Sequence, residues 1–431
     1  MTDRRQFVST MFAAGIGAPV LNSFAVRRVA EAAEIAGSAA PLALSEDEAY
    51  WGAIRRAFTL DDTLVNLNNG WSSPAPAHAL EQMIRDLRFS NELPVEHMAR
   101  LLEPRIESVR EGLARDFGCD PEEMAVTRNA SESNLTVIHG FNMKKGDEII
   151  ATTQNYGRMM NGWRQRALRE GIVIREVKLD TPPKSDEDVV RAFEAAITPA
   201  TRIIEVMHIS FMTGYIAPVR KIAEMARRRG VAVTVDGAHA YAHFPFTRDE
   251  LGPIDFYGAS LHKWLTAPIG TGLLYVRRDN VKNLWPLFAQ GANQIDDIRK
   301  YEEIGTHPAA NHNSIAVALA FHRSIGSERK IARLRMLRDR WANRLLTESD
   351  RVRMLTALGP ATNGAIATFN IEGMDMGKLN GWLWNNHRIS TAGLNHPEFT
   401  GMRITPNVYT SLDEIDRFTD KVILAMKKGL A

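Results

Sequence analysis

The sequence predicts an α/β protein with a mainly parallel central sheet that helices cover on both faces. Between residues 120 and 280, short apolar stretches alternate with segments of ten or more residues whose apolar positions recur at helical spacing. Strands and helices that alternate in this way form parallel sheets, because each connection has to return across the sheet. Ligands then bind beyond the carboxyl ends of the strands. Residues that directly follow the predicted strands are therefore the candidates for chemistry.

The predicted elements follow this alternation along the chain. Helices are expected first at 76–91 and 94–117, each with a proline near its start. Strands are expected at 124–127, 148–152, 173–179, 202–209, 231–235, 256–259 and 272–276. Helices between them are expected at 133–141, 159–170, 187–197 and 219–230. Beyond about residue 311, long helices surround a strand pair at 365–371 and 403–405, which indicates a smaller α+β domain.

Four segments are expected from this pattern. Residues 1–40 form an export signal, and 41–69 form a segment that packs with the small domain. Residues 70–310 form the large domain, and 311–431 form the small C-terminal domain.

The export signal is predicted from its charge and its short apolar run. Arg4 and Arg5 precede a run of about 16 residues, rich in Ala and Gly, which is shorter than the ~20 residues of a membrane span. The arginine pair resembles the twin-arginine signal, which carries folded proteins across the bacterial inner membrane. The expected location is the periplasm, with cleavage near 30–32 or 38–40. A tail with an accidental arginine pair would have the same sequence features.

The composition excludes several classes of protein. The 431 residues include 53 Lys and Arg against 51 Asp and Glu, a net charge of +2, so nothing predicts nucleic-acid binding. Hydrophobic residues make up 45% and charged residues 24%, a balance that excludes disorder for most of the chain. The single cysteine, Cys119, excludes an intrachain disulfide and a cysteine metal cluster.

Two strand ends carry the clearest chemical signals. Lys263 follows the strand at 256–259 and has two hydrogen-bonding residues beside it, which suits a lysine that forms a Schiff base. An exposed surface lysine could have the same neighbours in the sequence. Asp236 ends the strand before it, where a carboxylate can bind a metal, a ribose or a protonated pyridine nitrogen. His239 and His243 stand four residues apart in a loop, and we interpret them as packed histidines rather than metal ligands.

Three further positions fit a bound anion, a flat ring and a carboxylate. Ser131 lies where a strand runs into a helix, and a helix N-terminus is a natural phosphate seat. Tyr156 follows a strand and can stack on a ring. Arg403 can hold a carboxylate with two parallel hydrogen bonds. No glycine-rich dinucleotide pattern precedes a helix, which argues against a nicotinamide oxidoreductase.

Read together, these residues resemble the class V aminotransferase family of fold-type-I enzymes, which use pyridoxal 5′-phosphate (PLP). The resemblance runs from about residue 64 to the C-terminus, and its most specific part is the run Ser260–Leu–His262–Lys263 with Asp–Gly–Ala–His starting at Asp236. It implies that Lys263 forms the Schiff base, that Asp236 keeps the pyridine nitrogen protonated and that His239 sits near the phenolic oxygen. The remaining implied cofactor contacts are Tyr156 on the ring and Ala130, Ser131, Ser260 and His262 at the phosphate.

The resemblance also implies a substrate site and a partner. Arg403 matches the arginine that binds the substrate carboxylate, and Asn69 and Trp71 lie in a stretch that resembles the loop closing over the substrate. Thr306 matches a loop that reaches the phosphate across a dimer interface, which implies a homodimer with shared active sites.

Departures from the family pattern narrow the range of possible reactions. The loop at 392–397 has no cysteine, which argues against desulfurase chemistry, and Phe211 stands where many relatives carry asparagine. The aromatic residue resembles the isopenicillin N epimerase-like branch. We expect aminotransferase-type chemistry on an amino acid or a peptide-derived amino compound, such as a siderophore.

The sequence leaves three different functions open beside this reaction. Epimerisation would need a second acid, for which Tyr156, Tyr241 and His396 are the candidates. A C–S or C–C lyase would use the same cofactor. A periplasmic binding protein would also be exported and built of α/β domains, but it would not need the run that ends at Lys263.

Overall fold

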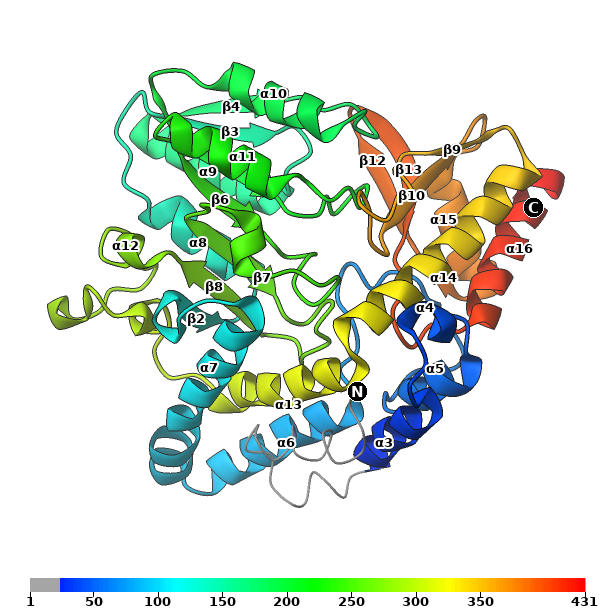
Figure 1. Ribbon diagram of the computed structural model, residues 1–431, viewed down its shortest axis with the longest axis horizontal. Coiled ribbons are helices and arrows are strands. Elements are labelled where there is room, and N and C mark those ends of the chain that lie inside the picture. The colour runs from blue at the N-terminus through cyan, green and yellow to red at the C-terminus, as the bar shows by residue number, and fades with distance from the viewer. Residues whose placement is uncertain (1–23, 431) are drawn as a thin grey trace.

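The computed structural model describes residues 24–430, in which a large and a small sheet stand next to each other (Figure 1). Arg4, Arg5 and most of the predicted export signal lie outside the described residues. The end of that predicted signal forms helix α3 (Phe24–Ala36), in which Ala32 and Ala36 are buried in the main core. Removal of residues 1–40 would therefore take a packed helix away from the fold.

The large sheet has seven strands in the order β2-β8-β7-β6-β5-β3-β4. Their bounds are β2 (Met124–Thr127), β3 (Glu148–Thr152), β4 (Val173–Val177), β5 (Thr201–Met207), β6 (Ala232–Asp236), β7 (Phe256–Ser260) and β8 (Gly272–Val276). The strands from β7 to β4 pair in parallel, whereas β8 runs antiparallel to both β2 and β7. The predicted α/β class with a mainly parallel sheet is confirmed.

Successive residues of each strand enter opposite cores, because side chains alternate between the faces of a sheet. In β7, Phe256 packs in one buried cluster and Tyr257 in another, and Ile149 and Ile150 of β3 divide in the same way. Both faces are covered, as a parallel sheet requires. One cluster includes residues of α8 (Ala130–Gly140) and α9 (Gly157–Glu170). The other includes residues of α7 (Ile106–Phe117), α10 (Asp186–Ala196), α11 (Val219–Arg228) and α13 (Ala309–Ile325).

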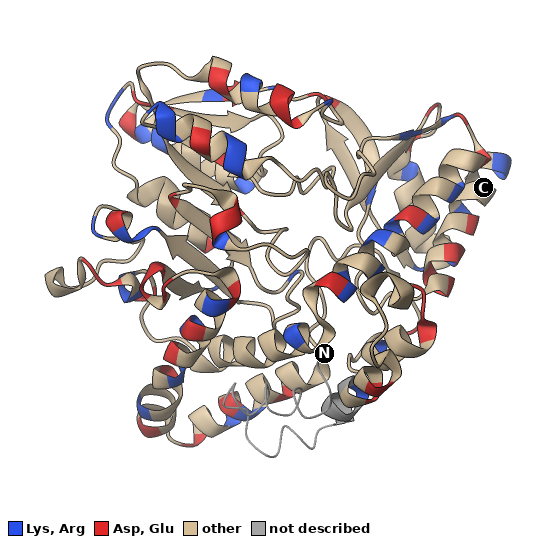
Figure 2. Ribbon diagram, viewed as in Figure 1, with Lys and Arg blue, Asp and Glu red and all other residues tan. Residues whose placement is uncertain are grey.

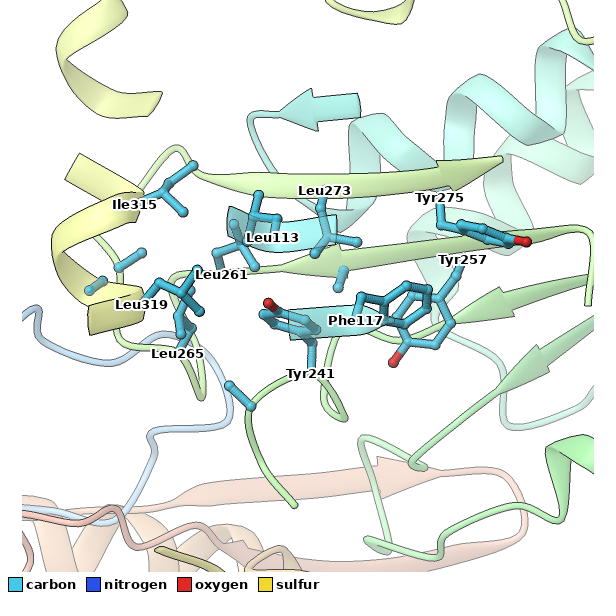
Figure 3. Packing of buried hydrophobic residues seen from close by; sticks show 14 of the residues in the cluster. Leu113, Phe117, Tyr241, Tyr257, Leu261, Leu265, Leu273, Tyr275, Ile315 and Leu319 are labelled. Atoms are coloured by element: carbon cyan, nitrogen blue, oxygen red, sulfur yellow. The ribbon is translucent and has the colours of Figure 1, made fainter. Parts of the chain in front are cut away.

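Apolar contacts between α7, α13 and the end of the sheet fix the strand ends. Figure 3 shows Ile315 and Leu319 of α13 facing Leu261 and Leu265, which flank the predicted Schiff-base lysine. These four side chains belong to one buried cluster. The loop that carries Lys263 is thus anchored on both sides by core residues.

The small sheet has four antiparallel strands in the order β12-β13-β10-β9. Their bounds are β9 (Val352–Met354), β10 (Ala367–Ile371), β12 (Ala392–His396) and β13 (Phe399–Ile404). The helices of this part are α14 (Ser327–Glu348), α15 (Met376–His387) and α16 (Leu412–Lys428). The short strand β1 (Val65–Asn66) pairs in parallel with β11 (Ile389–Ser390), so Val65 and Leu67 join the core of the small sheet. Trp51 of α5 (Glu48–Arg55) packs in the main core instead.

The remaining described helices are short or lie at the edge of the fold. They are α4 (Pro41–Leu44), α6 (Ala77–Glu92), α12 (Arg278–Val281), the π-helix η1 (Val95–Leu102) and the 3₁₀ turns η2 (Glu103–Arg105), η3 (Pro121–Glu123), η4 (Arg248–Leu251), η5 (Ala292–Gln294) and η6 (Ile298–Tyr301). Lys and Arg are interspersed with Asp and Glu along the outer helices, and the strands of the large sheet carry few charges (Figure 2). Within residues 24–430, no helix is long and apolar enough to cross a membrane.

Two element predictions were wrong in detail. The helix expected at 94–117 is divided into η1, η2 and α7, and Pro104 lies in the short η2. A proline has no N–H to donate and disrupts a continuous α-helix. The strand pair expected beyond residue 311 belongs to a four-stranded sheet, because the short strands β9 and β12 flank it.

Candidate active site

A cavity of about 590 Å³ opens at the carboxyl edge of the large sheet, facing the small sheet. Its walls come from the ends of β6 and β7, the first residues of α8, the loop at 70–72 and strand β13. The predicted site residues that line it are Trp71, Ala130, Ser131, Tyr156, Asp236, His239, Ser260, His262, Lys263 and Arg403. Asn69 and Thr306 do not line it.

Lys263 and His239 form a close pair in the wall made by β6 and β7. Lys263 Nζ lies 2.9 Å from His239 Nε2. Burial lowers the pKa of Lys263 to about 8, with the Asp236 carboxylate opposing this shift and the Arg403 guanidinium adding to it. Burial also holds the pKa of His239 well below its usual value, so the imidazole is neutral and its Nε2 can accept a hydrogen bond from the amine.

Asp236 ends β6 as a buried carboxyl group. Its Oδ1 accepts a hydrogen bond from the backbone N–H of Ala238 at 3.0 Å. Burial raises the pKa of Asp236, while the Ala238 amide, the Lys263 amine and Asn134 lower it. A carboxylate in this position favours a protonated, positively charged partner in the cavity.

The N-terminus of α8 forms the third wall. Asn129 caps this helix by accepting a hydrogen bond from the backbone N–H of Glu132 at 2.9 Å. The backbone N–H of Ala130 donates to Ser260 Oγ at 3.0 Å, which ties the helix start to the end of β7. The positive end of the helix dipole at Ser131 suits a phosphate.

Arg403 occupies the opposite wall, at the end of β13. Its Nη1 donates to the Phe211 carbonyl at 2.7 Å and its Nη2 donates to Asn68 Oδ1 at 3.0 Å, whereas its buried Nε has no partner. No carboxylate of the described residues forms an ion pair with it. Burial lowers the pKa of Arg403 to about 10, which leaves it charged at neutral pH. A Cβ on Gly70 would lie 3.2 Å from Arg403 Cζ, so the glycine makes room for the guanidinium.

Aromatic and cationic side chains surround the cavity mouth. Tyr156, 40% exposed, lies edge-on to Phe211 with ring centroids 5.3 Å apart. Trp71 is 73% and Ile269 is 67% exposed. Arg158 also lines the cavity, is exposed and has no ion pair within the described part of the chain. Arg158 was not among the residues predicted from the sequence, although its position two residues after Tyr156 at a helix start could have suggested it.

Asn69 and Thr306 take other places than the cavity wall. Asn69 is fully buried, and its Nδ2 donates to the Thr405 carbonyl at 2.8 Å, so it supports the loop beneath the cavity. Its neighbour Asn68 is the residue that reaches Arg403. Thr306 lies in a loop and does not line this cavity, and its role toward a partner subunit stays a prediction.

Of the three candidates for a second acid, only Tyr156 lines the cavity. Tyr241 is buried and donates to Asp116 Oδ2 at 2.8 Å, and His396 Nε2 lies 3.2 Å from the Thr153 carbonyl. Neither lines the cavity, whereas Tyr156 does. Cys119 is also outside the cavity, and burial raises the pKa of its thiol to about 12. Among residues 24–430, no group of three or more His, Cys, Asp or Glu could hold a metal ion.

Comparison with known proteins agrees with this arrangement. A family model described as aminotransferase class-V matches residues 65–415. The chain belongs to the class-V aminotransferase family. Isopenicillin N epimerase of Streptomyces clavuligerus is 30% identical over 389 residues, which cover 86% of this chain and 97% of that protein.

Solved structures of the same fold have lower sequence identity. The apo cysteine desulfurase of Thermococcus onnurineus NA1 superposes with a TM-score of 0.77 at 21% identity, covering 87% of this chain and 98% of that one. A variant of C-DES with glycine covalently linked to its PLP cofactor gives a TM-score of 0.76 at 21% identity, covering 86% and 98%. The chain is thus a PLP-dependent enzyme of the class-V aminotransferase type with the fold-type-I architecture.

The residues present fit PLP in this class-V enzyme. The cavity offers an amine of lowered pKa, a buried carboxylate and a helix N-terminus, which match an aldehyde, a protonated ring nitrogen and a phosphate. In addition, Nδ1 of the buried His239 has no partner in the described residues and is available to an oxygen of the ring.

One buried acid beneath this site was missed by the sequence analysis. Glu205 of β5 accepts hydrogen bonds from Asn155 Nδ2 at 2.9 Å and from Trp163 Nε1. Burial raises the pKa of Glu205 to about 7, and the negative charge of Asp236 adds to the shift. A single Glu in an apolar strand looks the same in the sequence whether its side chain is buried or exposed, because one residue does not change the hydrophobic pattern.

Proposed function

We propose that this enzyme exchanges the amino group of a carboxylate-bearing amino compound for oxygen by transamination. In transamination the amine passes to an oxo-acid acceptor. The observation that carries the proposal is that Lys263 and Arg403 line one cavity and neither is paired with a carboxylate of the described residues. An amine and a guanidinium that face each other across a cavity suit a substrate with an amino and a carboxylate group.

Lys263 is the proposed proton carrier. A pKa of about 8 leaves about a tenth of the amine neutral at pH 7, and a neutral amine can remove the proton from the amino-bearing carbon. The neutral His239 lies 2.9 Å away and holds the Lys263 amine by accepting a hydrogen bond from it. Because its imidazole is neutral, it places no second positive charge beside the amine. When bound, PLP supplies the electron sink that stabilises the resulting carbanion, and Asp236 favours the protonated ring nitrogen that this requires.

Arg403 is the proposed anchor for the substrate carboxylate. Its two terminal nitrogens are fixed by Phe211 and Asn68, so the guanidinium is held in place before substrate arrives. Each terminal nitrogen keeps a second N–H, and a planar guanidinium binds a carboxylate through two parallel hydrogen bonds.

The mouth of the cavity favours a substrate larger than a free amino acid. Trp71 and Ile269 offer exposed apolar surface, and Arg158 offers an unpaired positive charge. A peptide-derived amino compound with an apolar or acidic extension would contact all three. A siderophore precursor belongs to this chemical class.

Epimerisation is the second candidate, favoured by two observations. The relative that is 30% identical is described as isopenicillin N epimerase. Tyr156 lines the cavity, and its hydroxyl has no hydrogen bond in the described structure, so it is available as a second acid. Lyase chemistry of the desulfurase type has less support, because Cys119 lies outside the cavity with a raised pKa.

One experiment separates the two reactions. The holoprotein is mixed with amino acids and short peptides in heavy water, while the cofactor spectrum and the product mass are followed. Transamination would convert the cofactor to its amine form and release an oxo product. Retained cofactor, with deuterium on an inverted carbon, would establish epimerisation instead. No change of the spectrum or of product mass with any amino compound would contradict both reactions.

The assembly we propose is a homodimer. Partly exposed apolar residues recur at helical spacing along α6, because Leu80, Ile84 and Leu87 are 36–38% exposed in the described chain. A second copy would cover these residues and bring its Thr306 toward the phosphate seat. Light scattering should give twice the chain mass, and Ile84→Arg should shift it toward one chain mass. A wild-type monomer would contradict the dimer.

The location we propose is the periplasm, through twin-arginine export. The support is the sequence of residues 1–40 alone. Residues 1–45 fused to a reporter should direct it to the periplasm, and the pair of substitutions Arg4→Lys and Arg5→Lys should abolish this. A reporter that stays in the cytoplasm would contradict export.

A further inference from the structure

His243 lies between the Lys263 wall and the small sheet, and it does not line the cavity. Its Nε2 accepts a hydrogen bond from the backbone N–H of Ala365 at 2.8 Å. Its Nδ1 therefore carries the proton and donates to the His239 carbonyl, also at 2.8 Å. The ring is fully buried, and burial lowers the pKa of His243 to about 3, which keeps this neutral form across the working pH range.

The imidazole is clamped by its surroundings. It stacks on Trp264, with ring centroids 3.7 Å apart and planes 15° apart, and Trp264 directly follows Lys263 in the chain. Lys330 donates to the Trp264 carbonyl from below. A Cβ on Gly364 would lie 2.5 Å from His243 Nε2, so the small-domain chain can approach the ring only because residue 364 is glycine.

The hydrogen bond between His243 and Ala365 connects the ring to the strand that lies beside Arg403. Ala365 stands two residues before β10, and β10 pairs with β13 so that Thr368 lies opposite Arg403. The bond to His239 leads in the other direction to Lys263, because His239 Nε2 contacts the amine. The His243 ring therefore connects His239, which holds the Lys263 amine, to strand β10, which lies beside Arg403.

We propose that His243 is a positioning residue that sets the separation between Lys263 and Arg403. The proposal rests on the functions proposed above for these two residues. Arg403 Nη1 and Thr368 Oγ1 also donate hydrogen bonds to the carbonyls of Phe211 and Met212, but among the described residues this loop forms no hydrogen bond with the Lys263 side chain. The two hydrogen bonds of His243 have separate tasks: Nδ1 holds the His239–Lys263 pair, and Nε2 holds the Arg403 side.

Two substitutions separate these tasks. In His243→Asn, the side-chain amide can take the place of Nδ1 and donate to His239, while the acceptor for Ala365 is lost. In His243→Gln, the side-chain oxygen can take the place of Nε2 and accept from Ala365, while the donor to His239 is lost. The first readout is the pH midpoint of the absorbance of the holoprotein, which reports the Lys263–cofactor linkage. The second is the dissociation constant for propanoate, a carboxylate without an amine.

The expected results differ between the variants. His243→Gln should shift the absorbance midpoint and leave the propanoate constant as in the wild type. His243→Asn should leave the midpoint and weaken propanoate binding about fivefold, the size expected for one lost hydrogen bond. Gly364→Ala, which crowds Nε2 without removing a partner, should weaken propanoate binding in the same direction. His78→Asn is the matched control, because His78 is equally buried, packs on Phe321 and does not line the cavity.

Three results would overturn the proposal. Variants that lose thermal stability but keep both readouts would make His243 purely structural. Equal changes of both readouts in His243→Asn and His243→Gln would remove the division of tasks. A wild-type holoprotein without a borohydride-reducible linkage at Lys263 would overturn the proposed function and this inference together, a result that is visible before any variant is made.

Discussion

The two facing walls of the cavity are assembled over very different distances along the chain. Lys263 and His239 contact each other 24 residues apart, and their strands β6 and β7 are neighbours in the sheet. Arg403 is held by Phe211, 192 residues away, and by Asn68, 335 residues away. The proposed proton carrier is thus placed by one local strand pair. The proposed anchor for the substrate carboxylate is held by two distant parts of the chain, so changes in the two walls should have separable effects.

The largest effect is expected on the local wall. Lys263→Ala removes the proposed proton carrier, and turnover should fall roughly 10²–10⁴-fold, the range of a lost general acid–base group. The protein should still fold and bind PLP, but borohydride should no longer fix the cofactor, as read from the protein mass. Lys282→Ala, at an exposed lysine, is the control. Fixation of the cofactor at another lysine would refute the assignment of Lys263.

The distant wall should affect binding more than turnover. Arg403→Gln removes a buried charge that faces the substrate, and KM should rise about 30-fold or more, as for truncation of one partner of a buried charge pair. Arg403→Lys keeps the charge but loses the planar fork, so its KM should lie between those of Arg403→Gln and the wild type. Steady-state kinetics check this. A fall in kcat with unchanged KM would place the carboxylate elsewhere.

Below the Lys263 wall, a buried lysine should make stability depend on pH. Burial lowers the pKa of Lys330 from 10.5 to about 7. Between these values the unfolded chain binds a proton that the folded chain does not, so the free energy of unfolding rises with pH. Lys330→Met should reduce this slope by up to about 1.4 kcal/mol per pH unit in the cofactor-free protein. Urea unfolding from pH 7 to 10 measures it, with Lys221→Met as the exposed control; equal slopes in both variants would refute it.

The smallest effect distinguishes two adjacent asparagines. Asn68→Ala removes one hydrogen bond to Arg403 and should raise KM about fivefold with little change in stability. Asn69→Ala removes the buried bond to Thr405 and should lower the free energy of unfolding by about 1–3 kcal/mol with little change in KM. The reverse pattern would show that the sequence-based choice of Asn69 as the substrate residue was right.

The same contrast explains what could be predicted from the sequence. The β6 and β7 strand ends carry Asp236, His239 and Lys263 within 28 residues, so a periodic pattern was enough to place them at one edge. Asn68 and Asn69 are identical neighbours, and only the fold decides which of them faces Arg403. From the sequence, His243 could be interpreted as a packed histidine but not as a contact between the two domains. Its partner Ala365 lies 122 residues away and donates the hydrogen bond from its backbone N–H, which any residue carries.

The order of strands in the large sheet has a consequence for how the enzyme is made. Strand β2 pairs with β8, about 150 residues later, and the start of α8 is tied to Ser260. A ribosome that has finished β2 must therefore add most of the large sheet before the phosphate seat exists, and it must reach β13 before Arg403 closes the opposite wall. Long-range pairing of this kind delays folding until its last partner is synthesised. Capture of the cofactor thus has to wait until β8 (Gly272–Val276) has been synthesised.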